Sequence, residues 1–242
     1  MTMIKGRLNA VHTRIAAACA ACGRSAEAVR LLAVSKRFGP QAVAQALAAG
    51  QWAFGENYVQ EGVEKIVLLQ QTAYAPPALR PPEWHLIGPL QSNKSRLVAA
   101  HFDWVQTLDS LKLAQRLNDQ RPPELPPLQV CIQVNSDGDA AKSGVPAAAV
   151  VDFALALAQQ PLPRLQLRGL MAIGAAQPTY AAQLAQHRVT RALFDAVAAH
   201  GLPGLAQWNT LSMGMSDDLE AAIAAGSTLV RVGTAVFGAR PA

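Results

Sequence analysis

Two short apolar runs near the ends of the chain each stop at residues that can do chemistry. Residues 31–35 (LLAVS) are followed by Lys36, and residues 229–232 (LVRV) contain Arg231 and are followed by Gly233 and Thr234. If the runs are the first and last strands of a closed parallel barrel, they are neighbours in space. The site between them would then hold an amine that can form an imine and backbone N–H groups that can bind a phosphate.

Strand-like and helix-like segments alternate along the whole length of the chain. We expect strands at 31–35, 52–54, 84–88, 104–108, 128–134, 167–173, 208–213 and 228–232. We expect helices at 3–22, 40–50, 57–71, 91–100, 110–120, 146–160, 178–200 and 216–225. This α/β alternation, without a linker, predicts one domain over residues 1–242 with the fold of a (β/α)8 TIM barrel. A doubly wound open sheet is the alternative, but its usual Gly-rich first turn is not seen at 35–39 (SKRFG).

The opening segment predicts a helix that packs on the barrel. Ile4, Leu8, Val11 and Ile15 recur at helical spacing, with basic residues between them. The alternative is a cleaved targeting signal. The chain ends about ten residues after the last expected strand, which leaves no room for a full eighth helix. We therefore expect the opening helix to cover the seam between strands eight and one.

Helix ends can also be assigned from single residues. Asp109 or Ser110 and Ser216 are candidate N-caps, because their side-chain oxygens can accept from a free backbone N–H of the first turn. Gly50 and Gly226 are candidate C-terminal stops.

Composition narrows the classes of function. The net charge is +5, but the basic residues are scattered and form no nucleic-acid motif, so we expect an anionic ligand and no nucleic acid. No apolar stretch reaches the roughly 20 residues of a membrane helix. The three cysteines, an odd number, favour a reducing cytoplasm. Cys19 and Cys22 form a C-x-x-C motif within the opening helix, without a second pair, so we expect no metal site.

The chemistry of the expected site depends on a few residues. A lysine such as Lys36 is often a surface residue, but one partly shielded from water can lose its proton and attack an aldehyde. Arg231 could pair with a structural carboxylate or meet the ring nitrogen of a cofactor. The phosphate site is expected where strands seven and eight end, because barrels of this kind bind phosphate there. The residues at these ends are Ser212, Gly233 and Thr234. The alternative is that they are ordinary turn residues. An amine and a phosphate site in one pocket together indicate that the ligand is pyridoxal 5'-phosphate (PLP).

Seven sequence blocks carry a resemblance to a known family: 33–36 (AVSK), 54–61 (FGENYVQE), 84–94 (WHLIGPLQSNK), 142–144 (KSG), 168–171 (RGLM), 211–216 (LSMGMS) and 231–234 (RVGT). The chain resembles the YggS/PROSC-type pyridoxal phosphate homeostasis proteins, which are related to the N-terminal barrel of alanine racemase. The resemblance covers nearly the whole chain.

The resemblance implies a fold-type III barrel in which Lys36 holds the cofactor as an internal aldimine. It implies that Arg231 faces the pyridine nitrogen and that the phosphate is held by the residues Ser212, Gly233 and Thr234. It also implies that Asn57 lies beside the ring, and that His85, Asn135 and Met171 surround the cofactor. Lys142 matches a lysine that the family uses in handling the cofactor, and whether Lys142 or Lys94 forms a second cofactor site is left open.

Whether the chain is an enzyme depends on a second acid/base group. Two-base racemisation needs such a group opposite the lysine, which in alanine racemase is a tyrosine from a separate β domain. The three tyrosines here, Tyr58, Tyr74 and Tyr180, have no evident opposing position. We therefore expect no catalytic residue and a cytoplasmic, monomeric PLP carrier that buffers or delivers the cofactor, with PLP-dependent apoenzymes as transient partners. A racemase-like enzyme is the second hypothesis, and a nucleic-acid or scaffold protein is the third.

Overall fold

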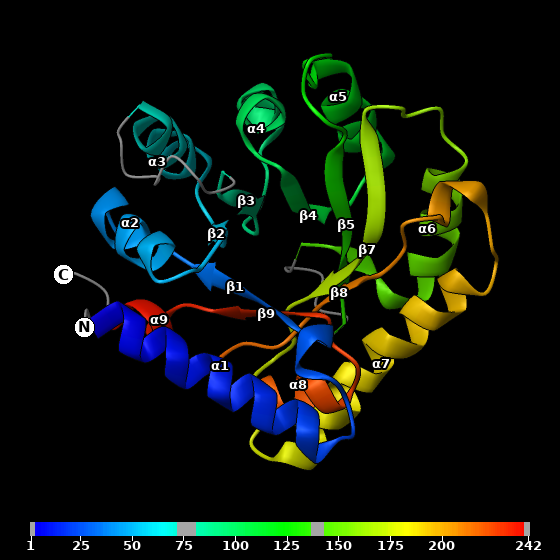
Figure 1. Ribbon diagram of the computed structural model, residues 1–242. Coiled ribbons are helices and arrows are strands. Elements are labelled where there is room, and N and C mark those ends of the chain that lie inside the picture. Colours follow the sequence, from blue (N-terminus) through cyan, green and yellow to red (C-terminus); the bar gives the residue numbers. More distant parts are fainter. Residues whose placement is uncertain (1–2, 72–80, 137–142, 240–242) are drawn as a thin grey trace.

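The computed structural model describes residues 3–71, 81–136 and 143–239, in which parallel strands form a barrel surrounded by helices (Figure 1). The strands are β1 (Arg30–Val34), β2 (Ala53–Glu56), β3 (Glu83–Leu86), β4 (Trp104–Leu108), β5 (Leu128–Asn135), β6 (Val145–Pro146), β7 (Leu165–Ala172), β8 (Thr210–Ser212) and β9 (Leu229–Val232). Their order is β4-β3-β2-β1-β9-β8-β7-β5-β6, and pairing between β4 and β5 closes the barrel. The eight expected strands form the closed barrel, which confirms the (β/α)8 fold. The two-residue β6 is an addition on β5 that the sequence did not predict.

Helices follow the strands around the outside of the barrel. The α-helices are α1 (Met3–Ala21), α2 (Pro40–Ala48), α3 (Val59–Gln71), α4 (Ser95–His101), α5 (Leu111–Gln120), α6 (Val150–Ala158), α7 (Tyr180–Ala198), α8 (Leu219–Ala224) and α9 (Thr234–Phe237). Short 3-10 turns are η1 (Ala26–Ala28), η2 (Ser92–Lys94), η3 (Ala147–Ala149) and η4 (Pro203–Leu205). The expected helices are therefore present, and several of them begin a few residues later than the sequence suggested.

The first and last strands of the barrel are neighbours, as the sequence predicted. β1 and β9 pair in parallel, with Leu31 opposite Val230 and Ala33 opposite Val232. Consequently, the carboxyl ends of the two strands lie side by side. This is the relationship that brings Lys36 and Thr234 to the same face of the barrel.

Helix α1 covers the seam next to these two strands. Its apolar face (Ile4, Leu8, Val11, Ile15, Ala18 and Cys19) is buried, and the helix packs against α8, α9 and α2 (Figure 1). Each large apolar side chain buried in this way stabilises the fold by about 1.5–3 kcal/mol. The Arg14 guanidinium adds a bidentate pair with Glu220 of α8, at 2.5 and 2.7 Å. The expected role of the opening helix is thus confirmed.

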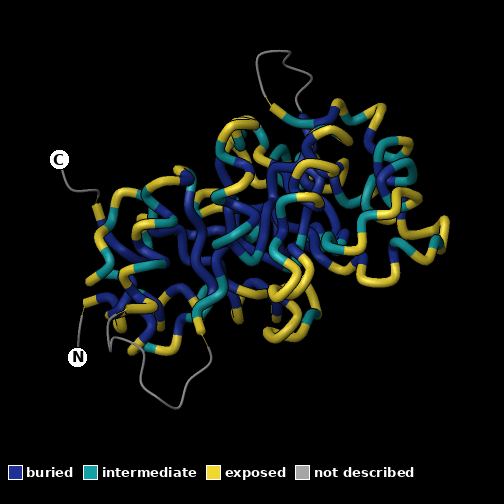
Figure 2. The backbone as a smooth tube through the Cα atoms, turned by 90° about the horizontal axis from the view of Figure 1, so that it is seen from above, coloured by how far each residue is buried: buried dark blue, intermediate teal, exposed yellow. Residues whose placement is uncertain are grey.

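Buried residues concentrate in the middle of the molecule and exposed residues on its outside (Figure 2). The strands are buried on both faces because helices cover them outside and side chains fill the barrel inside. The interior also holds fully buried polar side chains from several strands, among them His85, Gln106 and Ser212. Buried polar groups of this kind require hydrogen-bond partners, and their partners are described below.

The expected helix ends are confirmed with one exception. Ser110 caps α5 by accepting from the backbone N–H of Leu113, and Gly50 and Gly226 adopt positive φ angles of 93° and 101° just beyond α2 and α8. Ser216 does not cap α8, so that prediction was wrong. Asp218 is the N-cap residue instead, and its carboxylate accepts from the backbone N–H of Met215, which closes the preceding turn.

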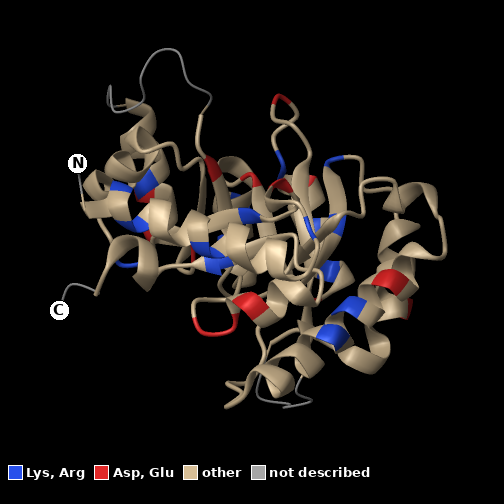
Figure 3. Cartoon of the chain, turned by 60° about the horizontal axis from the view of Figure 1, so that its bottom comes forward, with Lys and Arg blue, Asp and Glu red and all other residues tan. Residues whose placement is uncertain are grey.

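Acidic and basic residues are interspersed along the described chain (Figure 3). Cys19 and Cys131 are buried, Cys22 is exposed, and all three are free thiols. The described part of the chain contains no group of three or more His, Cys, Asp or Glu side chains placed to hold a metal ion. Among the helices of residues 3–71, 81–136 and 143–239, none combines the length and hydrophobicity that a bilayer crossing requires.

Candidate cofactor site

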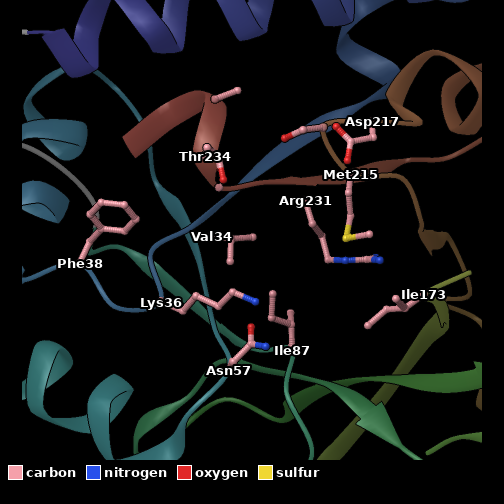
Figure 4. A pocket seen from close by; sticks show the side chains of 13 residues that line it. Val34, Lys36, Phe38, Asn57, Ile87, Ile173, Met215, Asp217, Arg231 and Thr234 are labelled. Atoms are coloured by element: carbon pink, nitrogen blue, oxygen red, sulfur yellow. The ribbon is translucent and has the colours of Figure 1, made fainter. Parts of the chain in front are cut away.

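A pocket of about 550 Å3 lies between the carboxyl ends of the strands β1 and β9. It has the size of a small-molecule site, and the carboxyl ends of the strands are where barrels of this fold place their active sites. Side chains from different strands converge on it (Figure 4). The pocket is lined by Val34, Lys36, Phe38, Asn57, Ile87, Ile173, Met215, Ser216, Asp217, Arg231, Gly233, Thr234 and Ala235.

Lys36 follows β1 and extends its side chain into the pocket (Figure 4). The residue before it is fixed on two sides: the Ser35 hydroxyl donates to Glu56 at 2.5 Å, and the Ser35 carbonyl accepts from the Lys65 ammonium at 2.7 Å. The residue after it, Arg37, adopts a φ of 65°. The lysine is thus presented from a rigid backbone, although its own side chain is only partly buried.

Arg231 lies on β9 with its guanidinium buried against the pocket. Nη1 donates to the Ser212 hydroxyl at 2.7 Å and Nη2 donates to the Ala172 carbonyl at 2.8 Å. Removal of the guanidinium from water lowers its pKa to about 10, so it stays charged at neutral pH. The group faces the pocket as a fixed hydrogen-bond donor that cannot act as an acceptor.

Asn57 follows β2 and contributes an amide to the pocket wall (Figure 4). Its Oδ1 atom is buried and accepts no hydrogen bond from the described residues. A buried oxygen of this kind costs free energy unless a ligand donates to it. Asn57 is therefore well placed to contact a polar ligand from the side.

The far end of the pocket has the features of a phosphate site. Gly233 precedes α9, and a Cβ atom added to it would lie 3.2 Å from the Val34 carbonyl oxygen, so glycine permits the close packing of β1 and β9. Thr234, the first residue of α9, and Ser216, in the turn that follows β8, add hydroxyl groups. The exposed Asp217 carboxylate lies on the same rim, where it would repel an anion (Figure 4).

The structure places two of the predicted site residues elsewhere. The Ser212 side chain is fully buried behind Arg231, and its hydroxyl accepts from the guanidinium and donates to Gln106 at 2.6 Å. That hydroxyl is used by the barrel interior and is not part of the pocket lining. His85 points into the barrel and toward the amino end of its strand, where Nε2 pairs with Glu83 at 2.7 Å. It too lies outside the pocket lining, because the ring stacks on Trp104 inside the barrel.

The remaining sequence predictions have mixed outcomes. Asn135 lines an adjoining cavity of about 310 Å3 that shares Asn57 with the main pocket. Met171 is buried in the barrel with Trp104 and Cys131, away from the pocket lining. Lys94 donates to Gln60 at 3.1 Å on the outside of the barrel. Lys142 lies outside the described residues.

Several residues at or behind the site were not predicted from the sequence. Ile87, Ile173 and Met215 form apolar walls of the pocket, but nothing in the sequence separates them from ordinary core residues. Gln106 had a visible signal, since it is a polar residue inside the apolar run 104–108 (WVQTL). Such a residue in a doubly buried strand indicates a hydrogen-bonded position in the interior.

Comparison with known proteins agrees with this geometry. The family profile "Alanine racemase, N-terminal domain" matches residues 7–241. The pyridoxal phosphate homeostasis protein of Escherichia coli K12 is 54% identical over 241 residues, which cover 99% of this chain and 98% of that protein. The chain belongs to the family of pyridoxal phosphate homeostasis proteins. The member of this family from Pseudomonas aeruginosa is 51% identical over 241 residues, covering 99% and 97% of the two chains.

Solved structures extend the comparison to three dimensions. PipY of Synechococcus elongatus with PLP bound has a TM-score of 0.80 and 34% identity, covering 98% of this chain and all of that one. Alanine racemase of Clostridium difficile has a TM-score of 0.70 at 16% identity, and the likeness covers 99% of this chain and 57% of that one. The second comparison shows a shared barrel fold only. The barrel of this chain therefore has the same fold as part of that alanine racemase.

Proposed function

We propose that this protein binds PLP reversibly through Lys36 and buffers or delivers the cofactor. The observation that carries the proposal is the convergence of Lys36, Asn57, Arg231 and Thr234 on one pocket of about 550 Å3. An amine, a fixed cation and a small-residue loop with hydroxyl groups match the aldehyde, the ring nitrogen and the phosphate of PLP. The relatives named for PLP homeostasis and the PLP-bound PipY structure support the same assignment.

Each residue has a distinct task in this proposal. When bound, PLP supplies an aldehyde that condenses with amines and a ring that withdraws electrons. Lys36 provides the amine that attaches the cofactor, and Asn57 contacts its ring from the side. Gly233 and Thr234 hold the phosphate with backbone N–H and hydroxyl groups.

Arg231 limits the chemistry that the site supports. Its guanidinium remains protonated, so Arg231 would donate a hydrogen bond to a ring nitrogen that faces it and would leave that nitrogen without a proton of its own. A neutral ring is a weaker electron sink than a protonated one. This favours carriage of the cofactor over demanding carbanion chemistry.

No tyrosine of the described chain lines the pocket as a second acid/base group. Tyr58 and Tyr180 are about half exposed at the starts of α3 and α7 and lie outside the lining, and Tyr74 lies outside the described residues. We therefore favour a carrier without a catalytic residue. A racemase-like enzyme of weak activity remains the second candidate, since Lys36 itself can act as a base.

We further infer that residues 1–242 work as a single, monomeric PLP-binding domain in the cytoplasm. Its partners would be PLP and, transiently, PLP-dependent apoenzymes. The described strands belong to one sheet, and the three free thiols fit a reducing compartment. Size-exclusion chromatography with light scattering would test the oligomeric state.

The proposal is tested by loading the protein with PLP, reducing it with borohydride and locating the modified peptide. We expect the modification on Lys36 in the wild type and its loss in Lys36→Ala. A modification that persists in Lys36→Ala, or lies on another lysine in the wild type, would overturn the assignment.

A second experiment separates carrier from enzyme. Cα proton exchange of L-alanine is followed by NMR in D2O with fully loaded protein. We expect no exchange. Exchange that depends on Lys36 would promote the racemase-like candidate.

A further inference from the structure

The barrel interior contains a continuous chain of hydrogen bonds that begins at Arg231. The Arg231 Nη1 bonds the Ser212 hydroxyl at 2.7 Å, and that hydroxyl bonds Gln106 Oε1 at 2.6 Å. Gln106 Nε2 lies 2.8 Å from His85 Nδ1, and His85 Nε2 lies 2.7 Å from Glu83 Oε1. The chain therefore runs from the pocket at the carboxyl ends of the strands to the amino end of β3.

This chain crosses the barrel instead of following the sheet. Arg231 and Ser212 lie on β9 and β8, whereas Gln106 and His85 lie on β4 and β3 across the interior. Ser212, Gln106 and His85 are fully buried, and Arg231 is 4% exposed. Water cannot readily replace these partners, so each bond in the chain depends on the next.

The direction of every bond follows from the chemistry of the two ends. A guanidinium only donates, so Ser212 accepts from Arg231 and must give its own proton to Gln106 Oε1. The Gln106 amide then presents its N–H to His85 Nδ1, which leaves the single proton of a neutral imidazole on Nε2. At the other end the Glu83 carboxylate requires a donor, and Nε2–H supplies it. Cation and anion thus enforce the same direction from opposite ends of the barrel.

Contacts around His85 support this neutral, oriented state. Its ring is stacked on Trp104 with centroids 4.9 Å apart and planes within 11°, which fixes the plane of the imidazole. Burial lowers the pKa of His85, so the ring is uncharged near neutral pH. Glu83 is held in turn by Arg30, whose Nη2 donates to the same oxygen at 2.6 Å.

We propose that Glu83, His85, Gln106 and Ser212 are positioning residues, which form a one-directional relay that fixes the Arg231 guanidinium toward the cofactor pocket. The relay gives a structural role to Ser212 and His85, whose side chains were expected at the cofactor but lie outside the pocket lining. This proposal rests on the proposed function, because the orientation of Arg231 affects PLP binding only if PLP occupies the pocket. The relay itself is a property of the protein without PLP.

The first test uses the full-length protein without PLP. Nitrogen-15 NMR of the histidine side chains reports which ring nitrogen carries the proton. We expect the neutral Nε2–H form for His85 at pH 7. In Gln106→Glu the ring lies between two carboxylates, so we expect both nitrogens to be protonated. A proton on Nδ1 of the wild type, or an unchanged neutral ring in Gln106→Glu, would overturn the relay.

The second test measures PLP affinity by titration with absorbance and fluorescence of the bound cofactor. Ser212→Ala and Gln106→Leu remove a link, and we expect each to raise Kd about tenfold, because Arg231 loses its fixed orientation. Ser212→Thr keeps the hydroxyl and should restore binding to within about twofold. Wild-type affinity and wild-type absorbance in Ser212→Ala would contradict the proposal.

Gln51→Leu is the matched control for these variants. Gln51 is also a buried glutamine in the barrel region, but its amide donates to the Leu31 and Ala53 carbonyls at 3.0 and 2.7 Å, outside the relay. It should lower the melting temperature as Gln106→Leu does, without changing PLP affinity. An equal loss of affinity in Gln51→Leu would mean that general destabilisation explains the effect and would refute the relay. If the wild type binds no PLP, the proposed function fails, and the nitrogen-15 result alone decides the relay.

Discussion

The carboxylate of Glu61 accepts a hydrogen bond from the backbone N–H of Arg37, the residue that follows Lys36. The same Oε1 atom pairs with the Lys65 ammonium at 2.7 Å, and Lys65 also donates to the Ser35 carbonyl at 2.7 Å. One helix, α3, therefore holds the backbone on both sides of Lys36. This explains how Arg37 keeps a φ of 65°, a conformation that costs a residue with a side chain about 1–2 kcal/mol.

Removal of the Glu61 carboxylate should loosen the attachment point of the cofactor. We expect Glu61→Ala to lower the free energy of unfolding by about 1–3 kcal/mol, because a charge-assisted hydrogen bond and an ion pair are lost together. Glu61→Gln should lose less, since its amide oxygen still accepts from the backbone. Urea denaturation measures the stability, and PLP titration should show weaker binding in Glu61→Ala.

Glu64→Ala is the control for this prediction. Glu64 lies on the same helix but is exposed. Its loss should change stability by less than about 0.5 kcal/mol. Equal effects of the two alanine variants would show that Glu61 has no special role at Lys36.

Acid should destabilise the protein in two successive ranges of pH. Burial lowers the pKa of His85 in the folded protein. Below about pH 6.5 the unfolded chain therefore binds a proton at His85 more readily than the folded protein does, and stability falls. Burial alone would raise the pKa of Glu83, but the hydrogen bond from His85 and the nearby Arg30 outweigh it and lower that pKa to about 2. The stability that Glu83 contributes is therefore present above pH 4.5 and is lost as the pH falls from 4.5 toward 2.

Urea denaturation between pH 3 and pH 8 measures this dependence. Glu83 should contribute on the order of 1 kcal/mol over the lower range, and His85 should add a loss of stability in the upper range. Glu83→Gln should flatten the lower range and leave the range near pH 6 in place. A wild-type curve that rises on acidification would contradict the assigned directions of both pKa shifts.

Gly88 should control the position of Asn57. A Cβ atom at residue 88 would lie 2.1 Å from the Asn57 backbone oxygen, a distance that no real contact allows. Gly88→Ala must therefore change the spacing between the backbones of residues 57 and 88, which line the pocket wall beside each other. We expect a loss of about 1–3 kcal/mol in stability and weaker PLP binding, measured by urea denaturation and titration.

The same substitution in α1 provides the comparison. Gly6 has no atom within 4 Å of the added Cβ. Because alanine is the better helix former, Gly6→Ala should stabilise the protein by about 0.5–1 kcal/mol and leave PLP affinity unchanged. Full PLP affinity in Gly88→Ala would mean that Asn57 is not a ligand contact.

Sequence periodicity predicted the barrel and the meeting of Lys36 with Arg231 and Thr234, because parallel strands carry their loop residues to one end. It could not predict the partners of Ser212 and His85. Both residues point inward, but whether an inward side chain contacts the pocket or the opposite end depends on three-dimensional neighbours. For Ser212 these are Arg231 and Gln106. For His85 the neighbour is Glu83, which draws the ring away from the pocket.

The prediction of one helix N-cap, Ser216, was wrong for a related reason. Ser216 has the right chemistry for an N-cap, but Asp218 closes the turn through the backbone N–H of Met215. The role of Asp218, two residues further along the chain, was not predicted from the sequence. Ser216 instead lines the pocket.

The Asp217 carboxylate should weaken PLP binding. It is exposed on the pocket rim with Thr234 and Ser216, the side that we assign to the phosphate. Like charges at a solvated rim repel each other by about 0.5–1 kcal/mol. We therefore expect Asp217→Asn to lower the Kd for PLP about two- to fivefold in low salt, measured by titration. The gain should shrink as salt is added, because ions screen exposed charges.

Asp195→Asn separates this local effect from the overall charge of the protein. Asp195 lies on α7, outside the pocket lining, where it pairs with Arg191 at 2.8 Å. Both variants raise the net charge by the same amount, so a general attraction for anions would tighten binding equally in the two. A tighter Kd in Asp217→Asn alone places the phosphate beside Thr234. No change in Asp217→Asn at low salt would mean that the phosphate lies elsewhere in the pocket, and the assignment of Gly233 and Thr234 would have to be abandoned.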